Sequence, residues 1–104
     1  RVLFRSGRAS IGMGFSASAN CIVGHANDEV PEIGNFVEMS VDSKILGGVT
    51  IPDDVVVGAG ALVIKTVESE GSVMGGVPAK VLSHHVLDEH ERRKRAVLIE
   101  LAKW

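Results

Sequence analysis

Residues 44–67, KILGGVTIPDDVVVGAGALVIKTV, combine aliphatic and small side chains in a way that suits neither an amphipathic helix nor an ordinary hairpin. Stepping by six along the chain reaches an aliphatic residue each time, at Ile33, Met39, Ile45, Ile51, Val57 and Val63. Four residues after each comes a small or β-branched residue: Val37, Ser43, Val49, Val55, Ala61 and Val67. A period of six predicts an all-β fold, a parallel β-helix with three short strands to a coil and a tight corner after each.

The same frame continues more weakly upstream, at Ile11, Ala17 and Val23. We therefore expect one coil over residues 11–28 and two more over residues 33–68. The spacing between Val23 and Ile33 is ten rather than six, so four extra residues must leave the coil as a loop. We place that loop at residues 29–32. Loops on rigid scaffolds often carry function.

The part of the chain that follows the repeats does not keep the six-residue period. Gly75, Gly76 and Pro78 are expected to end the β region, so that the β-helix domain covers residues 7–82. Asp88 with Glu91 forms a capping-box pattern, which predicts a C-terminal helix over residues 83–104 that packs on the coil end or on a neighbouring subunit.

The opening residues 1–6, RVLFRS, resemble a translated sequencing adapter. We interpret them as an artefact, with a genuine β-strand as the alternative. On the first interpretation the native sequence begins near Gly7, partway through a longer protein.

Composition excludes several classes of partner. The chain has 104 residues, enough for one small domain, and only 4% of them are aromatic. A net charge of -2 offers no basic footprint for nucleic acid. A single cysteine, Cys21, rules out an internal disulfide framework and suits a reducing, cytoplasmic compartment. No apolar run approaches the roughly 18 residues of a membrane span.

The stretch IGNFVEMSVDSKILGGVTIPDDVVVGAGALVIKTV, followed by GGVPAK, resembles the hexapeptide-repeat acyltransferases over residues 10–82. PEIG after a loop, KILGGVTI, VGAGALVIK and GVPAK are most similar to serine O-acetyltransferases and related sugar O-acetyltransferases. The resemblance implies a left-handed parallel β-helix of about three coils that assembles as a homotrimer or dimer of trimers. It also implies acetyl-CoA as co-substrate, bound between two β-helices, with no metal, and a histidine that acts as general base on a small-molecule acceptor.

This sequence departs from the family pattern at two points. In serine acetyltransferases a histidine stands directly before the P-x-I step, and that position here is Val30. A second family histidine precedes the segment that matches Ile11, and by spacing it falls just before Arg1, outside this sequence. The fragment as given therefore lacks both of these histidines.

His25 is the only histidine of the repeat region, and we take it as the candidate base. The alternative is a solvated corner histidine. Asp28 matches an acid in the related loop, although aspartate is also a common turn residue. The resemblance implies a coenzyme site that includes Ser40, Gly58, Ala59, Gly60, Lys65 and Lys80. The alternatives there are corner-forming glycines and ordinary surface lysines. Cys21 is expected to be a buried, inert thiol.

Acetyl-CoA-dependent O-acetyl transfer of the serine acetyltransferase type, a step of cysteine biosynthesis, is the first interpretation. Acetylation of a sugar hydroxyl or amine in surface-polysaccharide synthesis is the second, and Val30 favours it slightly. A non-catalytic β-helix used for assembly is a rival of another class. A zinc enzyme of the γ-carbonic anhydrase type needs three histidine ligands, and one repeat-region histidine cannot supply them.

Overall fold

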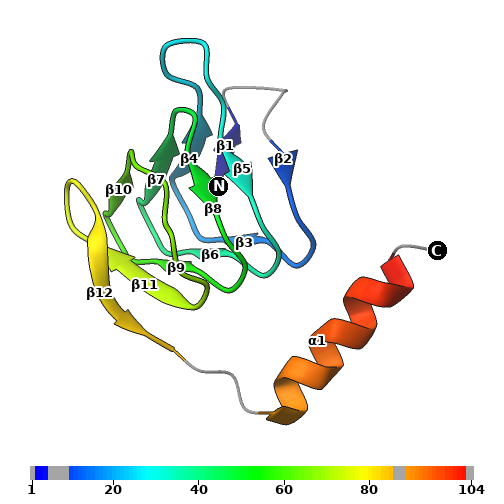
Figure 1. Ribbon diagram of the computed structural model, residues 1–104. Helices are drawn as coiled ribbons and strands as arrows, with labels where there is room; N and C mark the ends of the chain where they lie inside the picture. Colours follow the sequence, from blue (N-terminus) through cyan, green and yellow to red (C-terminus); the bar gives the residue numbers. More distant parts are fainter. Residues whose placement is uncertain (1, 5–9, 86–88, 103–104) are drawn as a thin grey trace.

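The computed structural model describes residues 2–4, 10–85 and 89–102. These residues form twelve short strands and one helix (Figure 1). The strands are β1 (Val2–Phe4), β2 (Ser10–Ile11), β3 (Ser16–Ala17), β4 (Cys21–Gly24), β5 (Glu32–Ile33), β6 (Glu38–Met39), β7 (Lys44–Leu46), β8 (Thr50–Ile51), β9 (Val56–Val57), β10 (Leu62–Val63), β11 (Ser72–Gly75) and β12 (Lys80–His84). The helix α1 covers Glu89–Ala102.

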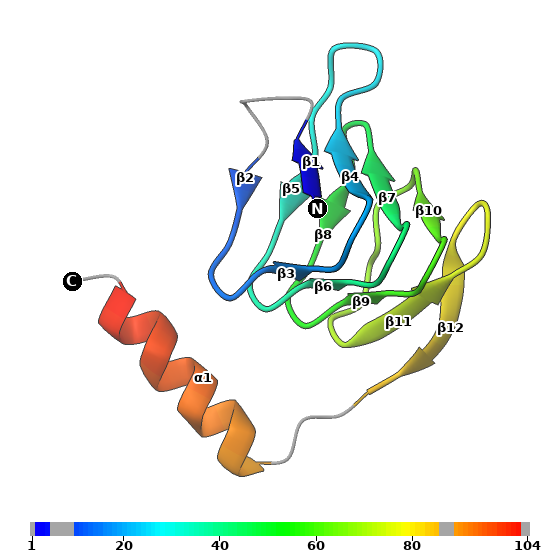
Figure 2. The same ribbon diagram turned by 180° about the vertical axis from the view of Figure 1, so that it is seen from behind.

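The strands stack into three sheets that form the sides of a prism, as Figures 1 and 2 show from opposite directions. The sheet orders are β1-β4-β7-β10, β2-β5-β8 and β12-β11-β9-β6-β3, and every pairing except β11 with β12 is parallel. Strands β2–β4, β5–β7 and β8–β10 each complete one coil, and β1 and β11 extend the stack at its two ends. The predicted parallel β-helix is therefore confirmed.

Both hexad series lie inside this prism. All twelve residues of the two series are at most 4% exposed. Upstream, Val23 is fully buried, whereas Ile11 and Ala17 are partly buried and pack against the core. Fully burying an aliphatic side chain contributes about 1.5–3 kcal/mol, so the stacked columns supply most of the stability of a chain with few aromatic residues.

The corners follow a second regularity. The third residue of most corners has a left-handed backbone, with φ between 57° and 71° at Gly14, Asn20, Phe36, Asp42, Asp54, Gly60 and Gly71. Glycine, asparagine and aspartate tolerate this conformation best, and Phe36 is the exception among them. We name three columns of corners: the Phe36 corner (residues 12–14, 34–36, 52–54 and 69–71), the Ser40 corner (residues 18–20, 40–42 and 58–60) and the His25 corner (residues 25–30, 47–48 and 65–66).

The four extra residues leave the coil at 26–29, not at 29–32 as predicted. Paired residues in β4 and β7 are 22 positions apart, and those in β5 and β8 are 18 apart, so the insertion lies between His25 and Val30. Asn27 and Asp28 have φ of 52° and 61°, which suits a two-residue type I′ turn. Pro31 is buried and accepts a hydrogen bond from the Ser10 amide (3.2 Å), so the chain has already rejoined the coil there.

The expected end of the β region was also wrong. Gly75, Gly76 and Pro78 turn the chain into β12, which pairs with β11 in the antiparallel direction, so strand structure continues to His84. The physical reason is that β11 would otherwise leave an unpaired edge at this end of the stack. Helix α1 then begins at Glu89 rather than near residue 83, and the predicted cap residue Asp88 lies outside the described residues.

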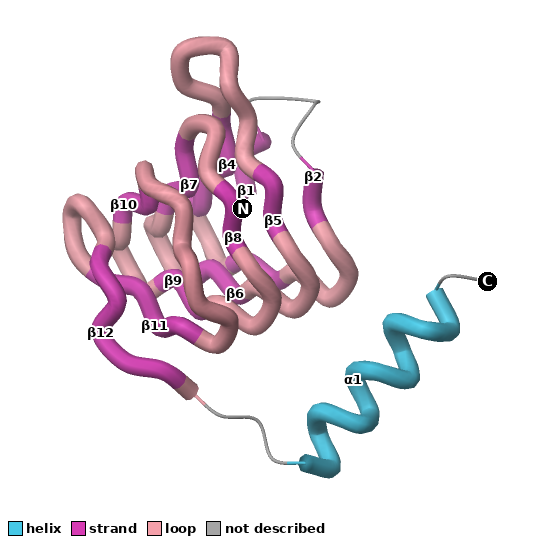
Figure 3. Tube along the Cα trace, in the orientation of Figure 1, coloured by secondary structure: helices cyan, strands magenta, loops and turns pink. Residues whose placement is uncertain are grey.

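At the other end, Val2–Phe4 form β1 and pair with Cys21, Ile22 and Val23 of β4. These residues occupy a strand position of the stack, as the alternative interpretation expected. The adapter origin of residues 1–6 stays a prediction. In Figure 3 loops and turns make up much of each coil. The reason is that the strands are only two to five residues long.

The burial of the hexad residues predicts that truncating an inward aliphatic side chain lowers the free energy of unfolding far more than truncating an exposed one. Ile45→Ala removes a fully buried side chain and should lower the free energy of unfolding by about 2–5 kcal/mol. Val77→Ala alters a side chain that is 70% exposed and should change it by less than about 0.5 kcal/mol. Urea unfolding followed by circular dichroism measures both. Equal effects would contradict the assignment of the core.

Candidate functional site on two corners of the β-helix

One outer face of the prism is mainly apolar and carries one charged residue, Lys44, on its middle strand. The outward side chains of β4, β7 and β10, with Ile64 just beyond β10, form what we call the apolar face: Ile22, Lys44, Leu46, Leu62 and Ile64. The corresponding outward residues of the sheet β2-β5-β8 are Ser10, Glu32 and Thr50, all exposed. An apolar outer surface bounded by polar corners is typical of an interaction or ligand site.

The Ser40 corner precedes the apolar face and has a fixed backbone. The carbonyl oxygen of Ser40 accepts hydrogen bonds from the Ser43 hydroxyl (2.7 Å) and the Cys21 thiol (3.0 Å). Both Ser43 and Cys21 are completely buried. The predicted burial of the Cys21 thiol is therefore confirmed, and this thiol is sequestered inside the coil.

In the next coil Gly58, Ala59 and Gly60 continue the same corner. A Cβ atom at Gly58 would lie 2.9 Å from the Met74 carbonyl oxygen, so close approach of β11 requires glycine there. Gly60 has φ of 69° and open space around its Cβ position, so the turn conformation, not crowding, favours glycine. Ala59 is exposed between them. Lys80 is exposed on β12 and pairs with Gly75, the residue that stacks beyond Gly58.

The His25 corner follows the apolar face and carries the hairpin. The amides and carbonyls of Ala26 and Glu29 bond reciprocally, both at 3.0 Å, which closes the two feet of the loop. Glu29 lies over Gly48 of the next coil, where an added Cβ would come 2.8 Å from the Cβ of Glu29. His25 and Asp28 are exposed on this hairpin, and Lys65 is exposed in the same corner, beyond β10.

The structure therefore divides the predicted site residues between two corners. Ser40, Gly58, Ala59 and Gly60 line one edge of the apolar face, and His25, Asp28 and Lys65 line the other. No described hydrogen bond joins the two sets directly within this chain. A ligand that contacts both sets must lie across the apolar face or against a surface brought next to it.

The sequence did not reveal two contacts. One is the packing of Glu29 on Gly48, for which the Gly47-Gly48 pair was the available signal. The other is a contact between α1 and the Phe36 corner, made by Arg95. Its signal was a phenylalanine at a corner position that glycine or aspartate occupies in neighbouring coils.

Within residues 10–85 and 89–102, no group of three histidine, cysteine, aspartate or glutamate side chains could hold a metal ion. The described helix, α1, has 14 residues and is neither long nor apolar enough to cross a membrane.

Comparison with known proteins supports the fold. No family model matches the chain. A chloramphenicol acetyltransferase of Agrobacterium fabrum is 36% identical over 72 residues, which make up 69% of this chain and 32% of that relative. The chain thus spans about a third of the length of this curated relative.

Solved structures define the class of fold, the left-handed parallel β-helix found in hexapeptide-repeat acetyltransferases. A maltose O-acetyltransferase from Clostridium difficile superposes with a TM-score of 0.60 at 21% identity, covering 84% of this chain and 65% of that one. A serine acetyltransferase from Brucella abortus, in complex with coenzyme A, gives a TM-score of 0.60 at 21% identity and covers 77% and 41%. The predicted left-handed β-helix is confirmed.

The geometry of the Ser40 corner predicts which substitutions Gly60 tolerates. Gly60→Asn should be nearly neutral, because Asn20 and Asp42 hold the same left-handed conformation in neighbouring coils, with φ of 61° and 60°. Gly60→Val should lower the free energy of unfolding by at least about 1–2 kcal/mol, because a β-branched residue resists positive φ. Thermal unfolding distinguishes the two. Equal losses would show that space, not backbone conformation, limits this position.

Proposed function

We propose that this chain is the β-helix of an acetyl-CoA-dependent O-acetyltransferase, with serine as the first acceptor to test. The observation that carries the proposal is the 36% identity to a chloramphenicol acetyltransferase, on a fold shared with serine and maltose acetyltransferases. The two polar corners beside the apolar face support it, since they contain every site residue that the sequence suggested except Lys80, which lies on the adjacent β12.

The reaction needs only the coenzyme, the acceptor and a base. The acceptor oxygen attacks the thioester carbonyl, its proton passes to the base, and the coenzyme thiolate leaves and takes up a proton. Holding the acceptor against the thioester removes the need for a covalent enzyme intermediate. A histidine with a pKa near neutrality suits both proton transfers, and corner amides can stabilise the oxyanion.

His25 is the proposed base. In the serine acetyltransferase pattern the histidine stands at the position of Val30, and in this fold His25 and Val30 directly flank one hairpin. Residues 26–29 are the insertion, so removing them would make His25 and Val30 neighbours in the coil. The substitution of the family histidine by valine can thus be offset within the same corner. Asp28, at the hairpin tip, is proposed to orient the acceptor.

The coenzyme is proposed to lie along the Ser40 corner. Ser40, Gly58, Ala59 and Gly60 present backbone and small side chains there, which lets an extended pantetheine arm approach closely. Lys80 near this edge and Lys65 across the apolar face are exposed ammonium groups suited to the coenzyme phosphates.

A homotrimer is part of the proposal, because it would bring the two corners of different subunits together. The apolar face offers Ile22, Leu46, Leu62 and Ile64 for such an interface, whereas the sheet β2-β5-β8 is polar outside. The proposal includes a cytoplasmic location, where acetyl-CoA is available and Cys21 stays reduced. Acetylation of a sugar hydroxyl or amine is the second candidate, favoured by the structural likeness to a maltose O-acetyltransferase.

Thiol release from acetyl-CoA tests the activity. The purified protein should release free thiol in the presence of serine, with maltose, an amino sugar and chloramphenicol as comparison acceptors. His25→Gln should reduce the rate by about 100-fold or more, the typical contribution of general base catalysis. His84→Gln is the matched control, since His84 is exposed on β12 and has no proposed role. Failure to bind coenzyme A at millimolar concentration would favour the non-catalytic scaffold.

The trimer has its own test. Leu46→Lys adds a second positive charge beside Lys44 on the apolar face and should convert a trimer to monomers in light-scattering measurements, because a buried charge without an opposite partner is costly. Thr50→Lys, one strand further on an exposed polar face, should leave the trimer intact. A wild-type protein that is already monomeric would contradict the proposed assembly.

A further inference from the structure

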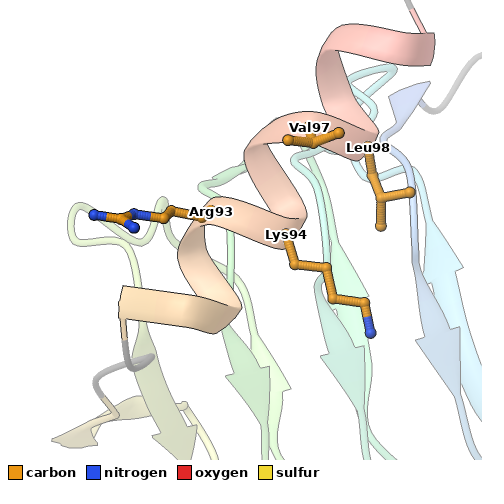
Figure 4. A pocket seen from close by; sticks show the side chains of 4 residues that line it. All are labelled: Arg93, Lys94, Val97 and Leu98. Carbon is orange, nitrogen blue, oxygen red and sulfur yellow. The ribbon is translucent and has the colours of Figure 1, made fainter.

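Helix α1 leaves much of its apolar surface exposed. Val97, Leu98 and Leu101 are 58%, 43% and 63% exposed. Val97 and Leu98, with Arg93 and Lys94, line an open depression of about 280 Å³ (Figure 4). Burial of these apolar side chains against the β-helix therefore does not account for the position of α1.

Arg95 contacts the β-helix through its side chain. Its guanidinium pairs with the Asp54 carboxylate and lies 4.6 Å from the centre of the Phe36 ring. The Arg95 and Asp54 side chains are only 25% and 20% exposed, so solvent screens this pair less than an ordinary surface pair. Phe36 and Asp54 are equivalent residues of adjacent coils, both in the Phe36 corner, so the arginine spans two coils.

Phe36 has an unusual backbone for an aromatic residue. Its φ is 57°, and the equivalent positions in the coils on either side are Gly14 and Asp54. A bulky residue in the left-handed region is strained and persists only where its surroundings offset the strain. The ring packs over Gly14, where an added Cβ would overlap it, and the guanidinium of Arg95 also lies against the ring.

The chain that leaves β12 is tied to the same corner. The amide of His85 donates to the Gly71 carbonyl (2.8 Å), and the His85 Nε2 atom lies 2.5 Å from the Asp54 carbonyl oxygen. Asp54 thus receives His85 at its backbone and Arg95 at its side chain. Asp54 therefore contacts both the segment that leaves β12 and helix α1.

We propose that Arg95 is a latch that holds α1 on the β-helix, and that Phe36 adopts its strained corner conformation to receive it. The described contacts of the latch are an ion pair and a cation–π contact, so releasing them exposes none of the buried core residues of the β-helix. A detached helix of 14 residues is marginally stable in water, and release therefore means unfolding of α1. The inference is independent of the proposed acetyl transfer.

Hydrogen exchange of the α1 amides, measured by mass spectrometry, tests the latch. Asp54→Asn and Arg95→Gln should each speed exchange in α1 by about tenfold, the effect expected for losing a partly buried pair with a cation–π contact. Phe36→Leu keeps a strained, apolar residue but removes the π face, and should give a smaller increase. Added salt should raise wild-type exchange in α1 and leave both pair variants nearly unchanged.

Two matched controls separate the latch from general damage. Asp42→Asn changes the same residue type at the same backbone conformation, φ of 60°, in a different corner. Lys94→Gln removes the neighbouring charge on α1 at a similar helix propensity. Both should exchange like the wild type. If Asp54→Asn matches Asp42→Asn, or Arg95→Gln matches Lys94→Gln, the latch is wrong.

A double-mutant cycle completes the test. If the two groups act on each other, the Asp54→Asn, Arg95→Gln double variant should exchange no faster than either single variant. Multiplied effects would show two independent disturbances and overturn the pairing. Arg95 is on the helix surface, so Arg95→Gln leaves the β-helix core intact. Unchanged exchange in Phe36→Leu would overturn the role given to the ring.

Discussion

The structure depends on the vertical stacking of inward aliphatic side chains. A single coil of this chain cannot bury its own hydrophobic face, because its strands are only two to five residues long. The fold is stabilised when successive coils stack and bury these faces together, as Ile33 does with Ile51 and Val23 with Ile45. The stack then fixes the backbone at every corner, since each corner is tied to the coils above and below it.

That constraint decides where function can be. Inward positions are committed to the core, and even polar ones such as Ser43 and Cys21 are used to hold corner carbonyls. Groups that bind a ligand or take part in a reaction can therefore lie only on outward side chains, at corners or in insertions. The three outer faces differ as a result: one is mainly apolar, one is polar, and one continues into β12 and ends the stack.

Much of this could be predicted from the sequence because burial repeats with the coil. The hexads from Ile33 to Val67 gave the core residues, the parallel β-helix and the corner positions. The spacing from Val23 to Ile33 gave the size of the insertion but not its position, because spacing does not say which residues stay in register. Pro31 was expected in the loop and is buried, while Ala26 was expected in the coil of residues 11–28 and begins the hairpin.

The features that the sequence concealed are those that do not follow the hexad. Strand β12 runs antiparallel and lies outside the six-residue repeat, so the repeat does not predict it. Its pairing depends on the open edge of β11. The contact of Arg95 with Phe36 and Asp54 joins residues that are far apart in sequence and unlike in pattern. Within the candidate site, Gly58 and Gly60 were expected at a corner, but the division of the site residues between two corners required the topology.

The insertion at the His25 corner shows why such a scaffold can change its chemistry without changing its fold. Four residues enter between His25 and Val30, yet Val23 and Ile33 both remain in the core, because the reciprocal bonds of Ala26 and Glu29 close the hairpin at its base. The side chains of residues 25 and 30, on either side of the hairpin, can therefore change while every stacked residue keeps its place.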